Sequence, residues 1–439
     1  MRRLWLGALL APALTAGPAL ADGGSAADPS LSGADIAWMI TASAMVLFMT
    51  PGLSFFYGGM VRAKNMISTM LQSFMCMGLV SLLWVVVGFS LAFGDSVRGL
   101  IGNPLTFFLF RGVGEQTHAA LAPTIPLILF SMFQLKFAII TPALITGAFA
   151  ERVRFRGYLL FVCLWSIVVY CPLAHWTWHP GGFLRQMGVL DFAGGTVVHM
   201  SAGFSALVAA WVFGHRQDYA PGVAHPPANV PYVLLGTGML WFGWFGFNAG
   251  SALAASPVAV QAIMTTHIAS GVAMLTWLVV DWLRKEKPSA VGACVGAVVG
   301  LVAITPAAGY VTVGASLVIG AAAGVVCNIA ARWRGRSTLD DTLDVFPCHG
   351  LGGVVGMLAT GLFASRLVNA GGADGLLRGN PALFWHHAVA LGVVAAFSLG
   401  ATYVLLKLCD AVVGIRITES EERIGLDETQ HGETWKLAA

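Results

Sequence analysis

The chain has 439 residues, of which 57% are hydrophobic and only 10% are charged. A soluble protein of this length needs a charged surface, so the composition excludes the soluble classes and favours an integral membrane protein. The formal net charge of +3 carries little information, because what matters is where the basic residues lie.

The N-terminal segment has the features of a secretory signal peptide. Arg2 and Arg3 precede an apolar stretch from Leu4 to about Leu20, and Ala19-Leu20-Ala21 is a small-x-small cleavage site. We therefore predict a signal peptide over residues 1–21 and a mature N-terminus outside the cytoplasm. A retained extra helix is the alternative interpretation.

Eleven apolar runs follow, each close to the roughly 20 residues that a helix needs to span a bilayer. They lie at about 35–60, 66–93, 122–149, 157–176, 196–214, 230–253, 258–283, 289–306, 309–331, 346–365 and 383–413. The sequence thus predicts an all-α membrane domain over residues 22–414, in which the fifth and eighth spans are short.

The distribution of basic residues gives the orientation. With an outside N-terminus, twelve Lys and Arg residues fall in inward loops and five in outward loops, as the positive-inside rule requires. The inward set is Arg62, Lys64, Arg152, Arg154, Arg156, Arg216, Arg284, Lys285, Lys287, Arg332, Arg334 and Arg336, and the outward set is Arg98, Arg111, Arg185, Arg366 and Arg378. Residues 415–439 are then a charged cytoplasmic tail.

Two histidines are the main candidates for function inside the membrane. With two inverted five-helix repeats plus a closing helix, His199 and His349 fall on corresponding helices, and inverted repeats place substrate pathways at their interface. Two neutral imidazoles can form a hydrogen-bonded track for a small neutral molecule. Two separately satisfied core histidines are the other possibility.

A carboxylate and several aromatic residues complete the candidate site. Asp191 precedes the fifth span, where it can cap the helix or act as an ion-attracting acid. Trp178, Phe137 and Phe247 offer aromatic faces that bind a cation, and Ser251 offers an acceptor hydroxyl. Each aromatic residue alone also fits an interfacial aromatic belt.

Several motifs resemble the ammonium transporter (Amt/Mep/Rh) family, bacterial Amt type, in order from about residue 35 to residue 435. The most specific are Asp191-Phe-Ala-Gly-Gly-Thr-Val-Val-His199, Gly243-Trp-Phe-Gly-Phe-Asn-Ala-Gly-Ser251 and Asp344-Val-Phe-Pro-Cys-His349-Gly. The tail from Glu422 to Glu433 is also similar to that family's cytoplasmic tail.

The resemblance implies roles for the candidate residues. Trp178, Ser251 and Phe137 form an outer ammonium recruitment site, which Asp191 supports. Phe137 and Phe247 close the pore mouth as a stacked gate. His199 and His349 line a pore that conducts ammonia with or without the proton.

The resemblance also implies partners and a location. It predicts a homotrimer in the inner (plasma) membrane and a PII-type signal protein that binds at the cytoplasmic face, so that residues 415–439 have a regulatory role. We expect membrane lipids around the chain and no enzymatic activity, cofactor, metal or nucleic-acid partner. The seven cysteines fall almost entirely in apolar runs and favour buried small hydrophobes over a metal or disulfide site.

Lys136 departs from the expected pattern, since it directly precedes Phe137 inside the third span. It can snorkel to the surface, lose its proton if buried, or repel cations near the recruitment site. The main alternative function is an ammonium sensor that signals through its tail and a PII-type partner. An integral-membrane metalloenzyme built on His175, His179, His199 and His349 fails because no carboxylates or cysteines lie at ligand spacing.

Overall fold

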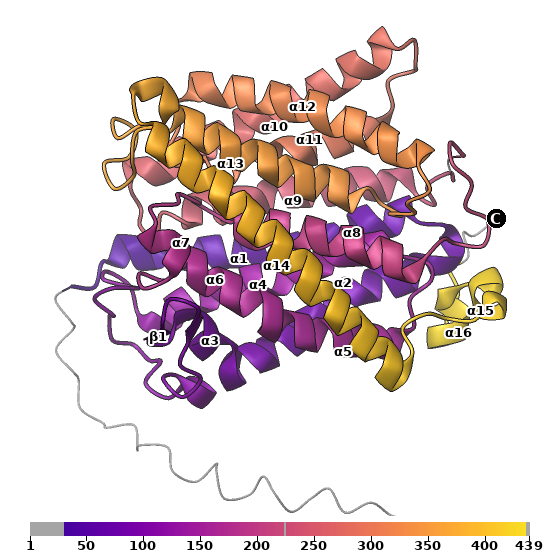
Figure 1. Cartoon of the computed structure of the whole chain (residues 1–439), viewed down its shortest axis with the longest axis horizontal. Coiled ribbons are helices and arrows are strands. Elements are labelled where there is room, and N and C mark those ends of the chain that lie inside the picture. Colours follow the sequence, from indigo (N-terminus) through magenta and orange to yellow (C-terminus); the bar gives the residue numbers. More distant parts are fainter. Residues whose placement is uncertain (1–29, 224, 436–439) are drawn as a thin grey trace, which may run out of the picture.

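The computed structural model describes residues 30–223 and 225–435, which form a bundle of helices that run roughly side by side (Figure 1). The predicted signal peptide at residues 1–21 lies outside the described residues. The two ends of the bundle carry different elements. The tail face carries α15 and α16, and the hairpin face at the opposite end carries β1, β2 and α7.

The first half of the chain contains the elements up to α8. They are α1 (Gly33–Met60), η1 (Ala63–Asn65), α2 (Met66–Leu83), η2 (Trp84–Gly88), α3 (Phe89–Phe93), β1 (Ser96–Val97), β2 (Ile101–Gly102), η3 (Phe108–Phe110), α4 (Leu127–Phe149), α5 (Phe155–Trp165), η4 (Ser166–Tyr170), α6 (Cys171–Trp178), α7 (Phe183–Gln186), η5 (Gly195–Met200) and α8 (Ser201–Phe213).

The second half contains the remaining helices and the tail. They are α9 (Val230–Gly250), α10 (Pro257–Leu283), α11 (Ala290–Ile304), α12 (Val313–Arg336), η6 (Phe346–Leu351), α13 (Gly352–Phe363), η7 (Leu376–Arg378), α14 (Pro381–Val413), α15 (Glu419–Ile424) and α16 (Leu426–His431).

Within the described residues, ten helical runs are long and apolar enough to cross a membrane, and the fifteen-residue α11 is a shorter apolar helix. Together they match the eleven predicted spans. Most helix boundaries in the structure lie close to the predicted ones, because polar capping residues flank the apolar runs. Asn229, for example, caps α9 by accepting a hydrogen bond from the Tyr232 amide at 3.0 Å.

Two predicted spans have displaced boundaries. The third span was expected from residue 122, but α4 begins at Leu127, after Pro126 in an extended conformation. The ninth was expected over 309–331, whereas α12 runs from Val313, behind the Thr312 cap, to Arg336. Arginines at the end of α12 therefore continue the helix beyond the apolar run.

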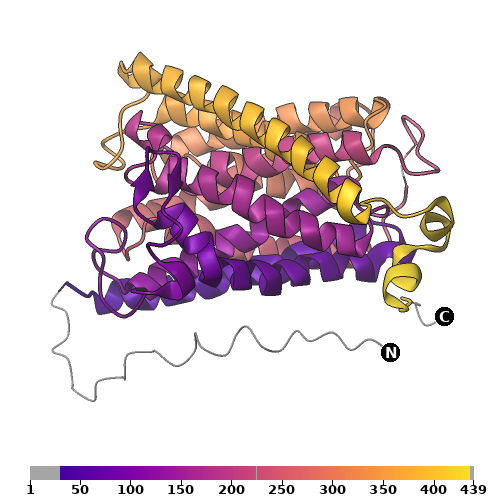
Figure 2. The same cartoon turned by 60° about the horizontal axis from the view of Figure 1, so that its bottom comes forward.

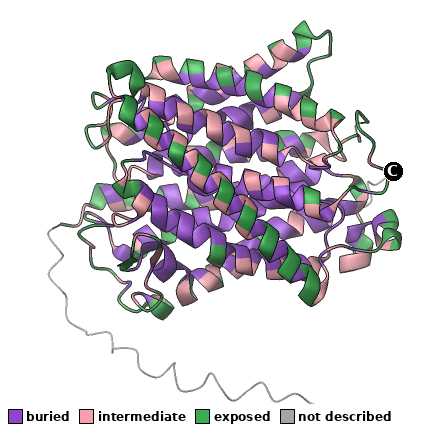
Figure 3. Cartoon of the chain, in the orientation of Figure 1, coloured by how far each residue is buried: buried purple, intermediate pink, exposed green. Residues whose placement is uncertain are grey.

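Exposed positions lie on the surface of the bundle and buried ones fill its interior (Figure 3). The pairs α1 with α9 and α10 with α11 and α12 pack most extensively, and glycines permit this close approach. A Cβ at Gly236 would lie 2.4 Å from the Phe56 backbone nitrogen. The long α14 crosses the outside of the bundle obliquely and leads to the tail (Figure 2).

In residues 30–223 and 225–435, four short π-helical segments interrupt the α-helices: η2, η4, η5 and η6. Such segments are rare in proteins overall, and those that occur are often found at functional sites. His199 lies in η5 and His349 lies in η6, so both candidate histidines occupy π-helical turns.

Candidate functional site

Asp191 caps the π-helix that carries His199. One carboxylate oxygen accepts hydrogen bonds from the Gly194 and Gly195 amides at 2.8 and 2.7 Å, and the other accepts from the Thr196 amide at 2.7 Å. The Thr196 hydroxyl donates to the same oxygen at 2.5 Å. The carboxylate is 5% exposed and is fully engaged with the start of η5. Of the two roles that the sequence left open for Asp191, helix capping and ion attraction, this geometry is that of a helix cap.

A cavity of about 330 Å³ opens at the hairpin face, and we call it the vestibule. Its lining includes Phe137, Trp178, Arg185, Asp191 and Ser251. Trp178, the last residue of α6, donates its indole hydrogen to the Asp191 carbonyl at 3.2 Å. The loop that Asp191 organises therefore also orients the Trp178 ring.

Ser251 lies at the end of α9, where its hydroxyl donates to the Phe247 carbonyl at 2.9 Å. The hydroxyl hydrogen is thereby used, and the oxygen lone pairs are left to accept from a donor in the vestibule. Trp178 offers a ring face beside it, so the vestibule combines a π face and a hydroxyl acceptor.

Phe137 and Phe247 lie at the bottom of the vestibule. Their ring centroids are 4.1 Å apart, and both side chains are at most 1% exposed. Phe137 lines the vestibule, whereas Phe247 lines a second cavity deeper in the bundle. The two rings, whose planes are tilted by 31° to each other, therefore separate the two cavities. Trp178 meets Phe137 edge-on at 5.6 Å.

The second cavity contains the two histidines, and we call it the histidine cavity. The Nδ1 atoms of His199 and His349 are 3.3 Å apart, and the side chains are 1% and 4% exposed. Apolar side chains form most of its wall, and Trp244 stacks on His199 at 5.4 Å. Its volume of about 10 Å³ is close to the smallest space that holds one water molecule, about 10–15 Å³.

A second aspartate caps the π-helix that carries His349. Asp341 accepts hydrogen bonds from the Val345 and Phe346 amides at 3.1 and 2.8 Å. It lies eight residues before His349, as Asp191 lies eight residues before His199. Burial raises the pKa of Asp341 to about 6, against the opposing charge of Arg334.

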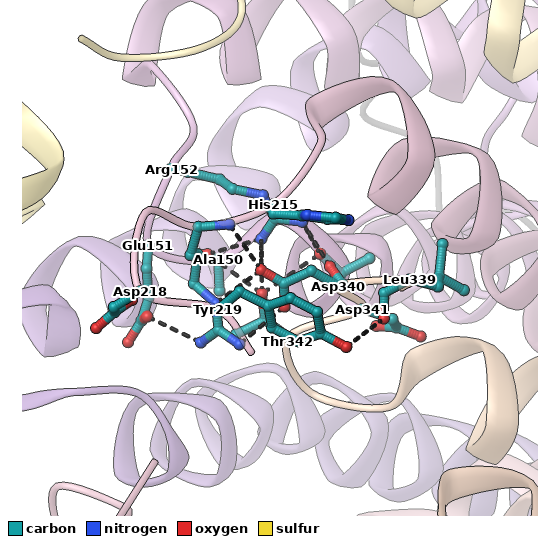
Figure 4. Close-up of polar contacts among 12 residues, drawn as sticks. Ala150, Glu151, Arg152, His215, Asp218, Tyr219, Leu339, Asp340, Asp341 and Thr342 are labelled. Carbon is teal, nitrogen blue, oxygen red and sulfur yellow. Dashed lines mark hydrogen bonds and ion pairs between the residues drawn. The ribbon is translucent and has the colours of Figure 1, made fainter. Parts of the chain in front are cut away.

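A buried ion network lies beneath the histidine cavity at the tail face (Figure 4). Arg216 bonds Asp340 at 2.8 Å and Glu151 at 3.0 Å, and Arg62 donates to Glu151 at 2.8 Å. Burial alone would raise the pKa of Glu151, but the hydrogen bond and charge of Arg62 and the charge of Arg216 outweigh it and lower the pKa. Burial lowers the pKa of Arg152 to about 10.

The network borders a cavity of about 500 Å³ at the tail face, whose lining includes Arg62, Glu151, Arg216 and Leu343. Among the described residues, no group of three or more His, Cys, Asp or Glu side chains could hold a metal ion.

The sequence pattern of the Ammonium Transporter Family matches residues 37–436. The ammonium transporter of Bacillus subtilis (strain 168) is 46% identical over 91% of this chain and 97% of its own length. Ammonium transporter Amt1 of Archaeoglobus fulgidus is 43% identical over 92% of this chain and 99% of its own length.

The chain belongs to the ammonium transporter family.

Solved structures of the ammonium transporter family share its fold. The crystal structure of Saccharomyces cerevisiae Mep2 has a TM-score of 0.84 at 36% identity, covering 90% of this chain and 89% of Mep2. A structure described as a sensor Amt protein has a TM-score of 0.82 at 31% identity, covering 91% and 98%. With ten apolar helical runs in its described part, this family member is a multi-pass membrane protein.

In this ammonium transporter family member, Lys136 points away from the ring stack. The side-chain Nζ of Lys136 donates to the Met132 sulfur at 3.3 Å, one helical turn back along α4. The residue is 4% exposed, whereas Met132 is 45% exposed, so the side chain runs toward the surface of the bundle. Lys136 does not line the vestibule.

Sequence reasoning missed several residues that the structure brings to the site. His387 of α14 is fully buried, and its Nε2 accepts from the Leu190 amide at 3.1 Å, which anchors the Asp191 loop. Asp341 was detectable from its spacing to His349, because the Asp191 and His199 pair shows the same interval. Arg185 was placed on the outer surface, but nothing in the sequence indicated that it lines the vestibule.

Proposed function

We propose that this chain transports ammonium across the inner (plasma) membrane, with its N-terminus outside and its tail in the cytoplasm. The observation that carries the proposal is the column formed by the vestibule, the Phe137–Phe247 stack and the His199–His349 pair. This column supports a path for a small hydrogen-bonding molecule through an otherwise apolar interior.

Ammonium first binds in the vestibule against Trp178 and Ser251. A cation over an indole face gains about 0.5–2 kcal/mol, and the Ser251 oxygen accepts one N–H. Phe137 completes this recruitment site, and Asp191 supports it through the Trp178 hydrogen bond. Ammonium then gives a proton to water at or before the gate of Phe137 and Phe247, and this proton either stays in the outer solution or crosses separately along His199 and His349.

Ammonia next passes the gate and hydrogen-bonds to His199 and His349 before it is protonated again on the inner side. An alkali cation cannot recover its hydration energy between apolar walls and two neutral imidazoles, whereas ammonia is dehydrated at little cost. The pore thus selects ammonia over alkali cations by the difference between their desolvation free energies.

The two capped π-helices support an arrangement of two inverted five-helix repeats with α14 as the closing helix. Asp191 with His199 and Asp341 with His349 share one spacing, and each aspartate accepts hydrogen bonds from the amides four and five residues further on. In inverted-repeat transporters the substrate site lies at the repeat interface, where these two histidines meet.

We further propose a homotrimer, and a PII-type signal protein that binds over the tail-face cavity. The described tail is held by the main domain at several points, among them Lys64 donating to the Glu422 carbonyl at 2.9 Å. A deletion beyond residue 414 should therefore reduce co-purification with such a partner. Unchanged co-purification would count against the part of the tail in binding.

An ammonium sensor that signals through the tail and the same partner is the second candidate. The structural likeness to a sensor Amt protein favours keeping it. A sensor would bind ammonium in the vestibule and need little flux.

An ammonium-concentration jump applied to proteoliposomes that contain the purified chain tests the proposal. A saturating transient current with ammonium, and none with potassium, would show that the proton crosses together with ammonia. If no current appears, a pH dye inside the same vesicles distinguishes electroneutral ammonia passage, which changes the internal pH, from a sensor, which does not. Absence of both signals would reject transport.

A further inference from the structure

Arg185 places a positive charge in the cavity where the proposed function requires a cation to bind. It belongs to α7, is exposed, and lines the vestibule together with Trp178 and Ser251. A cation beside a cation site lowers the local concentration of every positive ion. Arg185 therefore opposes the cation binding that the proposed function requires.

Hydrogen bonds within the turn and to the β1–β2 hairpin loop fix the backbone around Arg185. His179 Nδ1 accepts from the Gly181 amide at 2.9 Å, and the Phe183 amide donates to the Gly99 carbonyl at 3.1 Å. Gln186 donates to the Pro180 carbonyl at 2.6 Å. The turn and α7 are thus held to the β1–β2 hairpin loop, so Arg185 is presented to the vestibule by an ordered element.

The charge of Arg185 is not neutralised by a neighbouring carboxylate. Across residues 30–223 and 225–435, Arg185 takes part in none of the ion pairs. The other charged residue in the vestibule lining is Asp191, whose oxygens already accept four hydrogen bonds from the start of η5. The lining therefore carries one positive charge without an ion-pair partner among the described residues and one negative charge, that of Asp191, which hydrogen bonds hold at the start of η5.

Tyr310, in the loop after α11, lies within reach of both charges. Burial raises the pKa of its hydroxyl, the positive charge of Arg185 lowers it, and the charge of Asp191 raises it. Tyr310 also lines the vestibule. The charges of both Arg185 and Asp191 thus act on this part of the cavity wall.

We propose that Arg185 sets the ammonium affinity of the vestibule by electrostatic repulsion. The inference rests on the proposed function and deepens it, since it concerns the same cation site. Ammonium offsets the repulsion through the Trp178 face and the Ser251 oxygen, whereas a cation without these contacts does not. Arg185 therefore keeps the cavity empty of cations until ammonium is abundant enough to occupy it.

The expected size of the effect follows from Coulomb's law. Two unit charges about 3–10 Å apart in a water-filled cavity, at the dielectric constant of bulk water, change an equilibrium constant by about two- to tenfold. Salt screens such an interaction over about 10 Å at 0.1 M ionic strength.

The test compares half-saturating ammonium concentrations for transient currents in proteoliposomes at low ionic strength and after addition of choline chloride. The variants are Arg185→Gln, Arg185→Glu and Arg185→Lys, with Arg378→Gln as matched control. Arg378 is an exposed arginine on η7 that does not line the vestibule. The lysine variant retains the charge and changes the shape.

We expect Arg185→Gln to lower the half-saturating concentration about two- to tenfold, and Arg185→Glu to lower it further. Arg185→Lys and Arg378→Gln should match the unmodified chain, and added salt should reduce the differences. An unchanged value for Arg185→Gln, or the same shift for Arg185→Lys, would overturn the inference while the unmodified current still supports transport. An unmodified chain without any ammonium response would instead reject the proposed function, and this inference with it.

Discussion

The Nδ1 atoms of His199 and His349 lie 3.3 Å apart, although 150 residues separate them in the sequence. When two neutral imidazoles share this hydrogen bond, one ring is protonated on Nδ1 and the other on Nε2. The two Nε2 atoms then differ, one being an acceptor and the other a donor. The Nε2 atom of His199 has no partner among the described residues, so it is free to bond a molecule in the histidine cavity.

The first prediction concerns this pair. Replacing both His199 and His349 by leucine removes the only polar atoms that these side chains offer to the histidine cavity. We expect the ammonium current to fall or its selectivity over potassium to change. Ammonium- and potassium-jump currents measure both. His267→Leu is the control, because His267 is an exposed histidine on α10. Unaltered current and selectivity in the double variant would refute the role of the pair.

The second prediction concerns the ring stack. Phe247→Ala removes one of the two rings between the vestibule and the histidine cavity. We expect increased uptake of methylammonium relative to ammonium, because the opening between the cavities widens. Truncating a buried phenylalanine also costs about 3–5 kcal/mol of stability. Phe242→Ala, at a position on α9 that is 52% exposed, is the control, and an unchanged substrate ratio in Phe247→Ala would contradict the gate.

The third prediction concerns the cap of η5. Asp191→Asn replaces a carboxylate that accepts four hydrogen bonds by an amide with only one acceptor oxygen. Each hydrogen bond to a charged group contributes about 1.5–3 kcal/mol. We expect a lower thermal unfolding temperature in detergent and a loss of transport. Asp374→Asn should leave both unaffected, because within the described residues the half-buried Asp374 side chain accepts a single hydrogen bond, from the Arg366 amide at 2.9 Å, which an asparagine oxygen retains. Full transport by Asp191→Asn would show that the carboxylate charge is dispensable.

The fourth prediction concerns pH and the tail-face network. The pKa of Glu151 is lowered in the folded chain, so its contribution is present above its usual pKa of 4.5 and is lost as pH falls through the folded value. Breaking a buried pair costs about 3–5 kcal/mol, so Glu151→Gln should unfold at a lower temperature at pH 7. The difference from the unmodified chain should shrink below about pH 4.5. A difference that is equal at both pH values would exclude this electrostatic origin.

The fifth prediction concerns the attachment of the tail. Asp427 accepts hydrogen bonds from the Ile67 and Ser68 amides at 3.0 and 2.8 Å and so caps α2 from the other end of the chain. Loss of a cap costs about 0.5–2 kcal/mol, so Asp427→Ala should increase the detached fraction of the tail about two- to thirtyfold. Limited proteolysis of the tail measures this fraction. Glu428→Ala, at the exposed neighbouring position, is the control, and equal cleavage of the two variants would argue against the cap.

The number and position of the spans were predictable because lipid requires long apolar helices, and that requirement is written directly in the sequence. The candidate residues were found from motifs, and the structure brings Trp178 together with Phe137, and His199 together with His349. Their proposed roles are not decided by this proximity.

Other features had no local signal. The π-helical turns depend on tertiary packing, and Asp340 pairs with Arg216 across 124 residues. Arg185 shows the same difficulty, since its sequence neighbours give its side of the membrane but not the cavity that it lines. Contacts of this kind arise from the way distant loops meet and cannot be read from one segment.

Part of the binding site for the tail lies near the start of the chain. Leu426 donates its amide to the Asn65 side chain, and Asp427 caps α2 across about 360 residues. During synthesis these first loops are made long before the segment that covers them. A truncated or stalled chain therefore exposes uncapped amides on its tail face, whereas a finished chain covers them. Residues 426 and 427 thus cover polar groups that a chain truncated before them leaves exposed, at the surface where we propose that a cytoplasmic partner binds.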